Sequence, residues 1–185
     1  MDGTGNLQGT GPASIHDEQV VVLQLGGESY GVDIARVQEI KVMSPITSVP
    51  GAPPFIEGVI NLRGMIIPII DLRSKFDMCQ HADTERSCIV VIQLEQIDKK
   101  INMGIVIDEV REVLEIPAAD IEETPEFGAG IDTEFIMGIA KTGKTVKMML
   151  DISKVLTSSD VVAISGLAKS TGEGDVPAHS NQEKQ

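Results

Sequence analysis

The chain has 185 residues and a formal net charge of −13 at pH 7, from 28 acidic and 15 basic side chains. Such an excess of negative charge disfavours binding to nucleic-acid phosphates or to anionic lipid headgroups. With one Tyr, four Phe and no Trp, a surface that stacks bases on aromatic rings is not expected either. The length suits a single domain with an aliphatic core.

Both ends of the chain have the composition of disordered segments. Residues 1–17 are rich in Gly, Thr and Ser without an apolar period, and 159–185 are mostly similar, so neither buries enough apolar area to offset the entropy of ordering. The folded domain is therefore predicted over 18–158. The sequence has no signal peptide pattern and no apolar run long enough to span a bilayer, so we expect a cytoplasmic protein without membrane insertion.

Within the predicted domain, apolar residues occur in short runs of β-branched or alternating character, separated by turn residues. The runs that predict strands are 19–25, 29–34, 56–62, 65–71, 88–95, 101–107, 110–116, 135–140 and 146–150. Short helices are predicted at 35–40, 72–76 and 151–156, the last two after the N-cap candidates Asp71 and Asp151.

Turn signals every 8 to 12 residues favour barrels or a sandwich over βαβ units. We predict a mainly β fold of two small barrels that share strands. Pro68 lies inside one run and has no backbone N–H, which predicts a sheet edge or a bulge at that point.

The sequence shows no catalytic constellation. His16 and His179 lie in the predicted tails and His81 stands alone in a polar segment, so no metal-ligand cluster forms. Cys79 and Cys88 are nine residues apart, which fits neither a zinc knuckle nor a CxxC redox pair, and they are predicted to be free thiols. We expect no catalytic residue, metal or cofactor.

One motif argues for an enzyme. Residues 138–145 read GIAKTGKT, a literal match to the phosphate loop GxxxxGK[ST]. That loop needs a parallel strand before it and a helix after it, whereas the strand-like VKMML follows here. A hairpin is the favoured interpretation, and a small nucleotide-binding enzyme is the alternative that ATP titration would test.

A longer set of motifs resembles the CheW family of chemotaxis coupling proteins. The segments are YGVDIARVQEI at 30–40, PPFIEGV at 53–59, NLRGMIIPIIDLR at 61–73, MGIVIDEVREVLEI at 103–116, PEFGAGIDTEFIMGI at 125–139 and DISKVL at 151–156. The resemblance implies two intertwined five-stranded SH3-like barrels without enzymatic activity, monomeric when free. It implies binding to the signalling tip of methyl-accepting chemoreceptors and to the regulatory domain of the CheA histidine kinase.

Matching positions in this family imply a set of site residues. The receptor-facing residues would be Val37, Glu39, Gly58, Arg63, Gly104 and Val113, and Phe127 would face the kinase. The valines would offer apolar area to a partner helix. The glycines would let its backbone approach closely, so that a bulky replacement would block docking without unfolding the barrel.

Arg63 has two interpretations that the sequence leaves open. Its guanidinium either braces the local turn, with Glu39 as a candidate partner, or contacts a receptor directly. Asn61 and Gly64 are assigned to turn geometry because both tolerate positive φ. An adaptor of the same family serving surface motility or development rather than swimming chemotaxis also remains open.

Overall fold

The computed structural model describes residues 18–79, 82–96, 99–124, 134–156 and 160. The predicted disordered tails and Phe127 lie outside these residues, apart from Asp160, whose carboxylate accepts a hydrogen bond from Lys75 at 2.7 Å. The strands are β1 (Glu18–Leu25), β2 (Glu28–Asp33), β3 (Val37–Val42), β4 (Ile56–Leu62), β5 (Met65–Asp71), β6 (Cys88–Gln96), β7 (Lys99–Ile107), β8 (Glu109–Ile116), β9 (Ile121–Glu122), β10 (Ile136–Thr142) and β11 (Thr145–Leu150). The helical elements are α1 (Leu72–Lys75) and the 3-10 turns η1 (Ile34–Arg36) and η2 (Ala118–Asp120).

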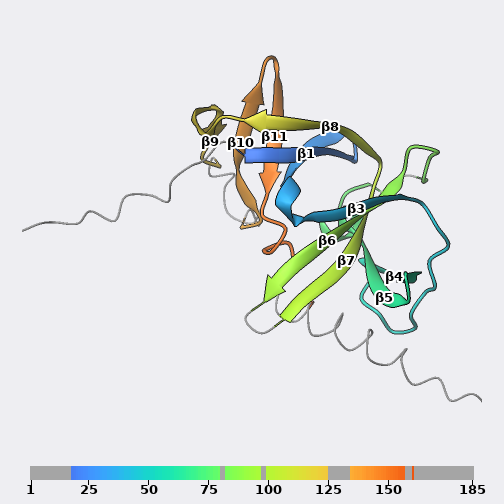
Figure 1. The fold of residues 1–185 in the computed structure, drawn as a ribbon. Coiled ribbons are helices and arrows are strands. Elements are labelled where there is room, and N and C mark those ends of the chain that lie inside the picture. Colours follow the sequence, from blue (N-terminus) through green and yellow to red (C-terminus); the bar gives the residue numbers. More distant parts are fainter. Residues whose placement is uncertain (1–17, 80–81, 97–98, 125–133, 157–159, 161–185) are drawn as a thin grey trace, which may run out of the picture.

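These strands form two sheets, as Figure 1 shows. A six-stranded sheet has the order β8-β1-β2-β11-β10-β9, and a five-stranded sheet has the order β3-β6-β7-β5-β4. The chain builds β1 and β2 of the first sheet, then the whole of the second, and returns to finish the first. This confirms the predicted mainly β fold. Each sheet forms one of two intertwined units, called modules below, and β9 is an additional short strand in the six-stranded one.

Three apolar clusters explain why the strand sequences are so continuously apolar. Val21, Leu23 and Leu25 of β1 enter a large cluster that includes β6 and β7 residues of the other sheet. Val20 and Val22, from the opposite face of β1, pack in a smaller cluster of the six-stranded sheet. Since successive side chains of a strand point to opposite faces, β1 is buried on both sides, within its own module and between the modules.

β6 repeats this division for the five-stranded sheet. Val90 and Ile92 belong to the large shared cluster, whereas Ile89 and Val91 pack in a cluster of β4, β5 and β7 residues. Each module therefore has its own interior, and the shared cluster holds the two modules together.

The helix predicted over 35–40 is wrong. Only the turn η1 forms, with the Asp33 side chain accepting a hydrogen bond from Ala35 N at 2.8 Å. The residues that follow are β3, which pairs with β6 in an antiparallel ladder and alternates between half-buried and exposed side chains. Pairing along the edge of a sheet with a buried face outweighs the weak helical preference of so short a segment.

The predicted short helix after Asp71 is confirmed as α1, whereas the one after Asp151 is wrong. Asp71 accepts a hydrogen bond from Arg73 N at 2.9 Å, as an N-cap does. Asp151 accepts one from Ser153 N at 3.1 Å, and a single turn follows, closed by Lys154 N to the Asp151 carbonyl at 2.9 Å. The closing segment is a series of turns that buries Val155 and its apolar neighbours against the shared core.

Pro68 does not lie at a sheet edge, because β5 runs between β7 and β4, but the β4–β5 ladder has a register shift on the partner strand at 56–58, next to the pair that Pro68 forms. Its cross-strand partner Val59 directs both its N–H and its carbonyl to Thr47, each at 2.9 Å, and so does not bond to β5 at this point. The ladder with β7 begins only at Ile69. The missing N–H of Pro68 therefore falls just before that ladder, where no strand bond is lost.

The GIAKTGKT segment forms the hairpin that was predicted. β10 and β11 pair antiparallel around Gly143, which has φ 63°, and the residues after the turn are a strand. The strand–loop–helix geometry of a phosphate loop is not formed by these residues, so the nucleotide-binding alternative loses its structural basis.

Candidate partner-binding surface

Arg63 stands at the tip of the β4–β5 hairpin. Arg63 has φ 52° and Gly64 has φ 86°, and Gly64 N donates a hydrogen bond to Asn61 Oδ1 at 2.8 Å. The turn assignment of Asn61 and Gly64 is thus confirmed, although positive φ occurs at Arg63 rather than at Asn61. This backbone directs an arginine away from the barrel, with 76% of its side chain exposed.

The Arg63 guanidinium meets Glu39, as the sequence allowed. Its Nη2 lies 2.8 Å from Glu39 Oε2, and the Glu39 side chain is 27% exposed. Glu39 belongs to β3, at one end of the strand order, and Arg63 joins the two strands at the other end. The ion pair therefore connects the two ends of the sheet and helps to close it into a barrel, while leaving most of the guanidinium accessible.

Three of the predicted residues share one row across the five-stranded sheet. Glu39 is opposite Val91, Val91 is opposite Gly104, Gly104 is opposite Ile69, and Ile69 is opposite Gly58. Residues in register across a sheet direct their side chains to the same face. The row includes Val91 and Ile69, which pack in the barrel's own cluster, so this face is the inside of the barrel.

Gly58 and Gly104 therefore face the barrel interior, and the expectation that a partner helix needs their missing side chains is not supported. A Cβ at Gly58, where φ is 150°, would lie 2.1 Å from the Thr47 carbonyl oxygen. A Cβ at Gly104 would lie 2.5 Å from Ile69 Cδ1. The space beside both glycines is filled by the chain itself. Because a Cβ at Gly58 would meet the backbone of Thr47, a bulky replacement of Gly58 would disturb the barrel.

The two predicted valines differ in exposure. Val37 is half-buried against the shared core, so much of its apolar area is already covered. Val113 is 55% exposed on β8, the outer strand of the six-stranded sheet. It belongs to the module that does not contain Arg63, so the predicted receptor-facing set extends over both modules.

Sequence reasoning missed three exposed apolar side chains on the elements that carry the Arg63–Glu39 pair. Ile40 is 46% exposed and Val42 78% exposed on β3, and Met65 is 51% exposed beside the hairpin tip. We call Ile40, Val42, Arg63 and Met65, together with Glu39 as the inward-facing ion-pair partner of Arg63, the candidate surface. β3 is an edge strand, and an exposed apolar edge strand is a typical site of protein association. Reading residues 37–42 as a strand would have found them, since its outer residues are Gln38, Ile40 and Val42.

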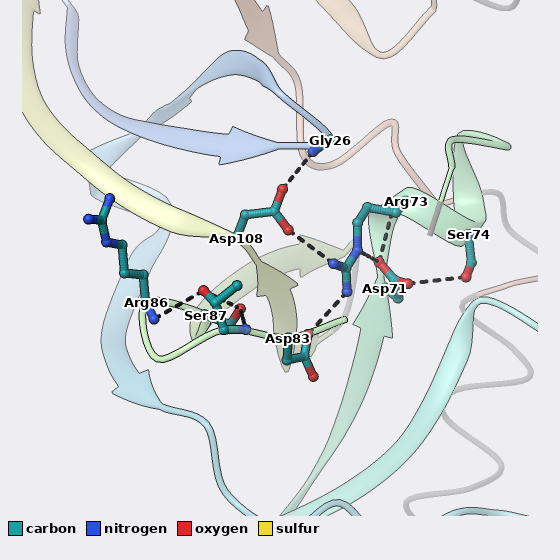
Figure 2. A network of polar contacts seen from close by, with 9 residues as sticks. Gly26, Asp71, Arg73, Ser74, Asp83, Arg86, Ser87 and Asp108 are labelled. Carbon is teal, nitrogen blue, oxygen red and sulfur yellow. Dashed lines mark hydrogen bonds and ion pairs between the residues drawn. The ribbon is translucent and has the colours of Figure 1, made fainter. Parts of the chain in front are cut away.

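The sequence also gave no role to Arg73, the last residue of NLRGMIIPIIDLR. It lies at the start of α1 with 4% of its side chain exposed, and its guanidinium contacts Asp71, Asp83 and Asp108 (Figure 2). A buried guanidinium surrounded by carboxylates is a structural element of high energetic consequence. The only sequence signal for it was an arginine two positions after Asp71, which ends a buried strand and is the N-cap of α1.

Burial raises the pKa values of two further groups, of which only Glu57 is influenced by the charges around Arg73. Burial, with the nearby charges of Asp71 and Asp83, raises the pKa of the Glu57 carboxyl. Burial raises the pKa of the Cys88 thiol. Both Cys88 and the exposed Cys79 are free, as predicted.

In the described ranges, no group of three or more His, Cys, Asp or Glu side chains is placed to hold a metal ion, and no helix there is long and apolar enough to cross a membrane.

The fold and the surface define a double-barrel β-module with an exposed edge strand and an exposed hairpin tip. The family model of the CheW-like domain matches residues 19–160. The chain belongs to the CheW-like domain family.

Individual relatives agree with that assignment. The chain is 37% identical to a chemotaxis protein CheW of Klebsiella aerogenes over 83% of this chain and 90% of the relative. It is 34% identical to the chemotaxis protein CheW of Treponema pallidum over 84% and 93%. The crystal structure of the scaffolding protein TtCheW from Thermoanaerobacter tengcongensis superposes with a TM-score of 0.69 at 35% identity, covering 78% of this chain and 95% of that one.

Proposed function

We propose that this protein is a non-catalytic adaptor of chemotaxis signalling, which couples methyl-accepting chemoreceptors to the CheA histidine kinase in the cytoplasm. The observation that carries the proposal is the likeness to chemotaxis CheW proteins over nearly their whole length. The solved relative is itself described as a scaffolding protein. An adaptor needs surfaces rather than a reacting group, which agrees with a fold whose accessible features are strands and turns.

The conformation of Arg63 supports a binding role for the candidate surface. A residue with a Cβ at φ 52° is unfavourable by about 1–2 kcal/mol, and Asn or Gly would relieve much of this strain. Strain of this kind persists where the surroundings enforce it and is concentrated at functional sites. A planar, forked and mostly exposed guanidinium suits recognition of carboxylates or carbonyls at a receptor tip.

The receptor tip is proposed to bind across the candidate surface and Val113. Ile40, Val42 and Met65 supply apolar area, which contributes about 25 cal/mol per Å² removed from water, and Arg63 supplies an oriented charge. The kinase is proposed to bind elsewhere, through Phe127, which lies outside the described residues. Separate sites would let one adaptor hold both partners at the same time.

A reconstituted array of kinase, receptor signalling fragments and this protein tests the proposal. Kinase activity should rise only when all three components are present. Arg63→Ala should abolish that rise while the protein stays folded, and Phe127→Ser should weaken association with the kinase but not with the receptor. Activation that does not require this protein, or saturable binding of ATP to it alone that is lost on changing Lys144, would overturn the adaptor function.

A further inference from the structure

Arg73 holds a buried position that the adaptor function leaves unexplained. Its Nε lies 3.1 Å from Asp71 Oδ1, its Nη1 3.0 Å from Asp108 Oδ1 and its Nη2 3.4 Å from Asp83 Oδ1 (Figure 2). Burying a guanidinium is costly unless several oriented acceptors compensate. The chain provides them from three separate segments: the end of β5, the link from β7 to β8, and the stretch between α1 and β6.

Asp71 fixes the direction of the Arg73 side chain. Its Oδ1 accepts hydrogen bonds from both the backbone N–H and the Nε–H of Arg73, and its Oδ2 accepts one from Ser74 Oγ at 3.2 Å. Asp71 is itself paired with Val106 of β7. Asp71 therefore holds the guanidinium rigidly on the five-stranded sheet, in the orientation in which it contacts Asp108.

Asp108 extends the contact to the other sheet. It stands between β7 and β8, where the chain passes from the five-stranded to the six-stranded sheet. One carboxylate oxygen accepts from Arg73, and the other accepts from Gly26 N at 2.7 Å, in the β1–β2 turn. Asp108 N donates to the Gln24 carbonyl at 3.0 Å. Arg73, Asp108 and Gly26 thus form a continuous polar connection, the Arg73 relay, between the two modules.

We propose that the Arg73 relay is the device that fixes the relative placement of the two modules. The shared apolar cluster holds them together, but hydrophobic attraction is non-directional and tolerates small rotations. A forked guanidinium bound to a carboxylate that is itself bound to a backbone N–H fixes distance and angle together. Arg73 is therefore a positioning residue, and its loss should loosen the arrangement of the modules more than it opens either one.

This placement has a consequence for partner binding that rests on the proposed function. Val113 lies on β8, the strand that begins directly after Asp108, whereas Arg63 lies on the five-stranded sheet. A receptor that touches both depends on their separation, which the relay sets.

The test needs no partner, so its outcome is independent of the proposed function. In the full chain, Cys79→Ser removes the exposed thiol, and Val42→Cys and Val146→Cys place one spin label on an exposed site of each sheet. Pulsed electron resonance gives the distance distribution between the labels, and hydrogen exchange reports the Gly26 amide separately. The variants are Arg73→Gln and the milder Asp108→Asn, which leaves the contacts of Arg73 with Asp71 and Asp83 in place.

Arg111→Gln is the matched control, because Arg111 also bonds to the β1–β2 hairpin, through Gln24 Oε1 at 3.0 Å, but is half exposed. We expect both relay variants to broaden the distance distribution and to speed exchange at Gly26 by about tenfold or more relative to core amides, and the control to change neither. If Arg73→Gln does not fold, Asp108→Asn decides alone. An unchanged distribution, or exchange that rises equally at all core amides, would overturn the proposal.

Discussion

The Glu39 carboxylate and the Arg63 guanidinium meet at 2.8 Å across the line where the five-stranded sheet closes on itself. An ion pair this exposed contributes about 0–1 kcal/mol to stability. Arg63→Ala should therefore lower the free energy of unfolding by no more than about 1 kcal/mol, measured by urea denaturation, while abolishing receptor-dependent kinase activation. Lys141→Ala, which breaks the exposed pair with Glu122, is the control and should leave activation intact.

A substitution of Glu39 distinguishes the two interpretations of Arg63. Glu39→Gln removes the charge partner but keeps the guanidinium. If Arg63 contacts the receptor, Glu39→Gln should keep much of the receptor affinity that Arg63→Ala loses. Equal losses in titrations of the two variants would show that the pair acts only as a brace of the barrel.

The backbone of Arg63 allows a prediction about stability alone. At φ 52°, Arg63→Gly relieves about 1–2 kcal/mol of left-handed strain but costs about 0.5–1 kcal/mol of unfolded-state entropy. Arg63→Gly should thus be more stable than Arg63→Ala by roughly 0.5–1 kcal/mol, and both lack the ion pair. Chemical denaturation of the two variants measures the difference, and a more stable Ala variant would mean that the turn has another conformation in solution.

Replacing Gly58 by a residue with even the smallest side chain should lower the stability of the fold. Gly58→Ala combines a φ of 150° with a Cβ 2.1 Å from the Thr47 carbonyl oxygen, and backbone cannot yield as a side-chain end can. We expect a loss of about 2–5 kcal/mol, from strain of about 1–2 and overpacking of about 1–3 kcal/mol. Gly51→Ala, at φ 77° with nothing within 4 Å, carries strain without the clash. Similar losses for both variants in denaturation would contradict the packing role.

Shortening the side chain of Ile69 should recover part of the stability that Gly104→Ala loses. The Cβ of Gly104→Ala would meet Ile69 Cδ1 at 2.5 Å and Ile89 Cγ2 at 2.7 Å. Ile69→Val removes the first of these atoms and alone costs about 0.5–1.5 kcal/mol. The double variant should be more stable than the sum of the two single losses predicts, by about 0.5 kcal/mol or more. Strict additivity in a double-mutant cycle would show that the two positions are not in contact.

Strand alternation and turn residues predicted most of this fold because each signal is local. The β4–β5 hairpin is an example, since Arg63 and Gly64 separate two apolar runs. β3 was missed because six residues after a genuine turn fit a helix or a strand equally well, and pairing with β6 decides between them. β9 has two residues and therefore no period to detect.

The candidate site was predictable only in part. Glu39 was a candidate partner of Arg63 in one of the two interpretations left open, and the structure forms that ion pair between residues of two separate motifs. Whether the missing side chains of Gly58 and Gly104 face a partner or the interior depends on the register of five strands, which no local pattern contains. The burial of Arg73 likewise depends on carboxylates at positions 71, 83 and 108, which only the folded chain brings together.

Glu57 should make stability depend on pH. Burial and the charges of Asp71 and Asp83 raise its pKa above the ordinary 4.5, with Arg73 partly opposing them. A carboxyl with a raised folded-state pKa binds its proton more tightly in the folded protein. The contribution of the Glu57 carboxyl to stability is therefore complete at pH values below its unfolded-state pKa, and it is lost as pH rises through its folded-state pKa.

Glu57→Gln removes this dependence. The variant should match the parent's free energy of unfolding near pH 3, where Glu57 is protonated in both states, and exceed it at pH 7, with the difference growing as pH rises through the window above 4.5. Urea denaturation at a series of pH values measures the difference. Glu123→Gln, on the exposed segment after β9, controls for the loss of one negative charge. A difference that is constant from pH 3 to pH 7, or a variant less stable than the parent at neutral pH, would show that the Glu57 carboxylate is favoured by its surroundings.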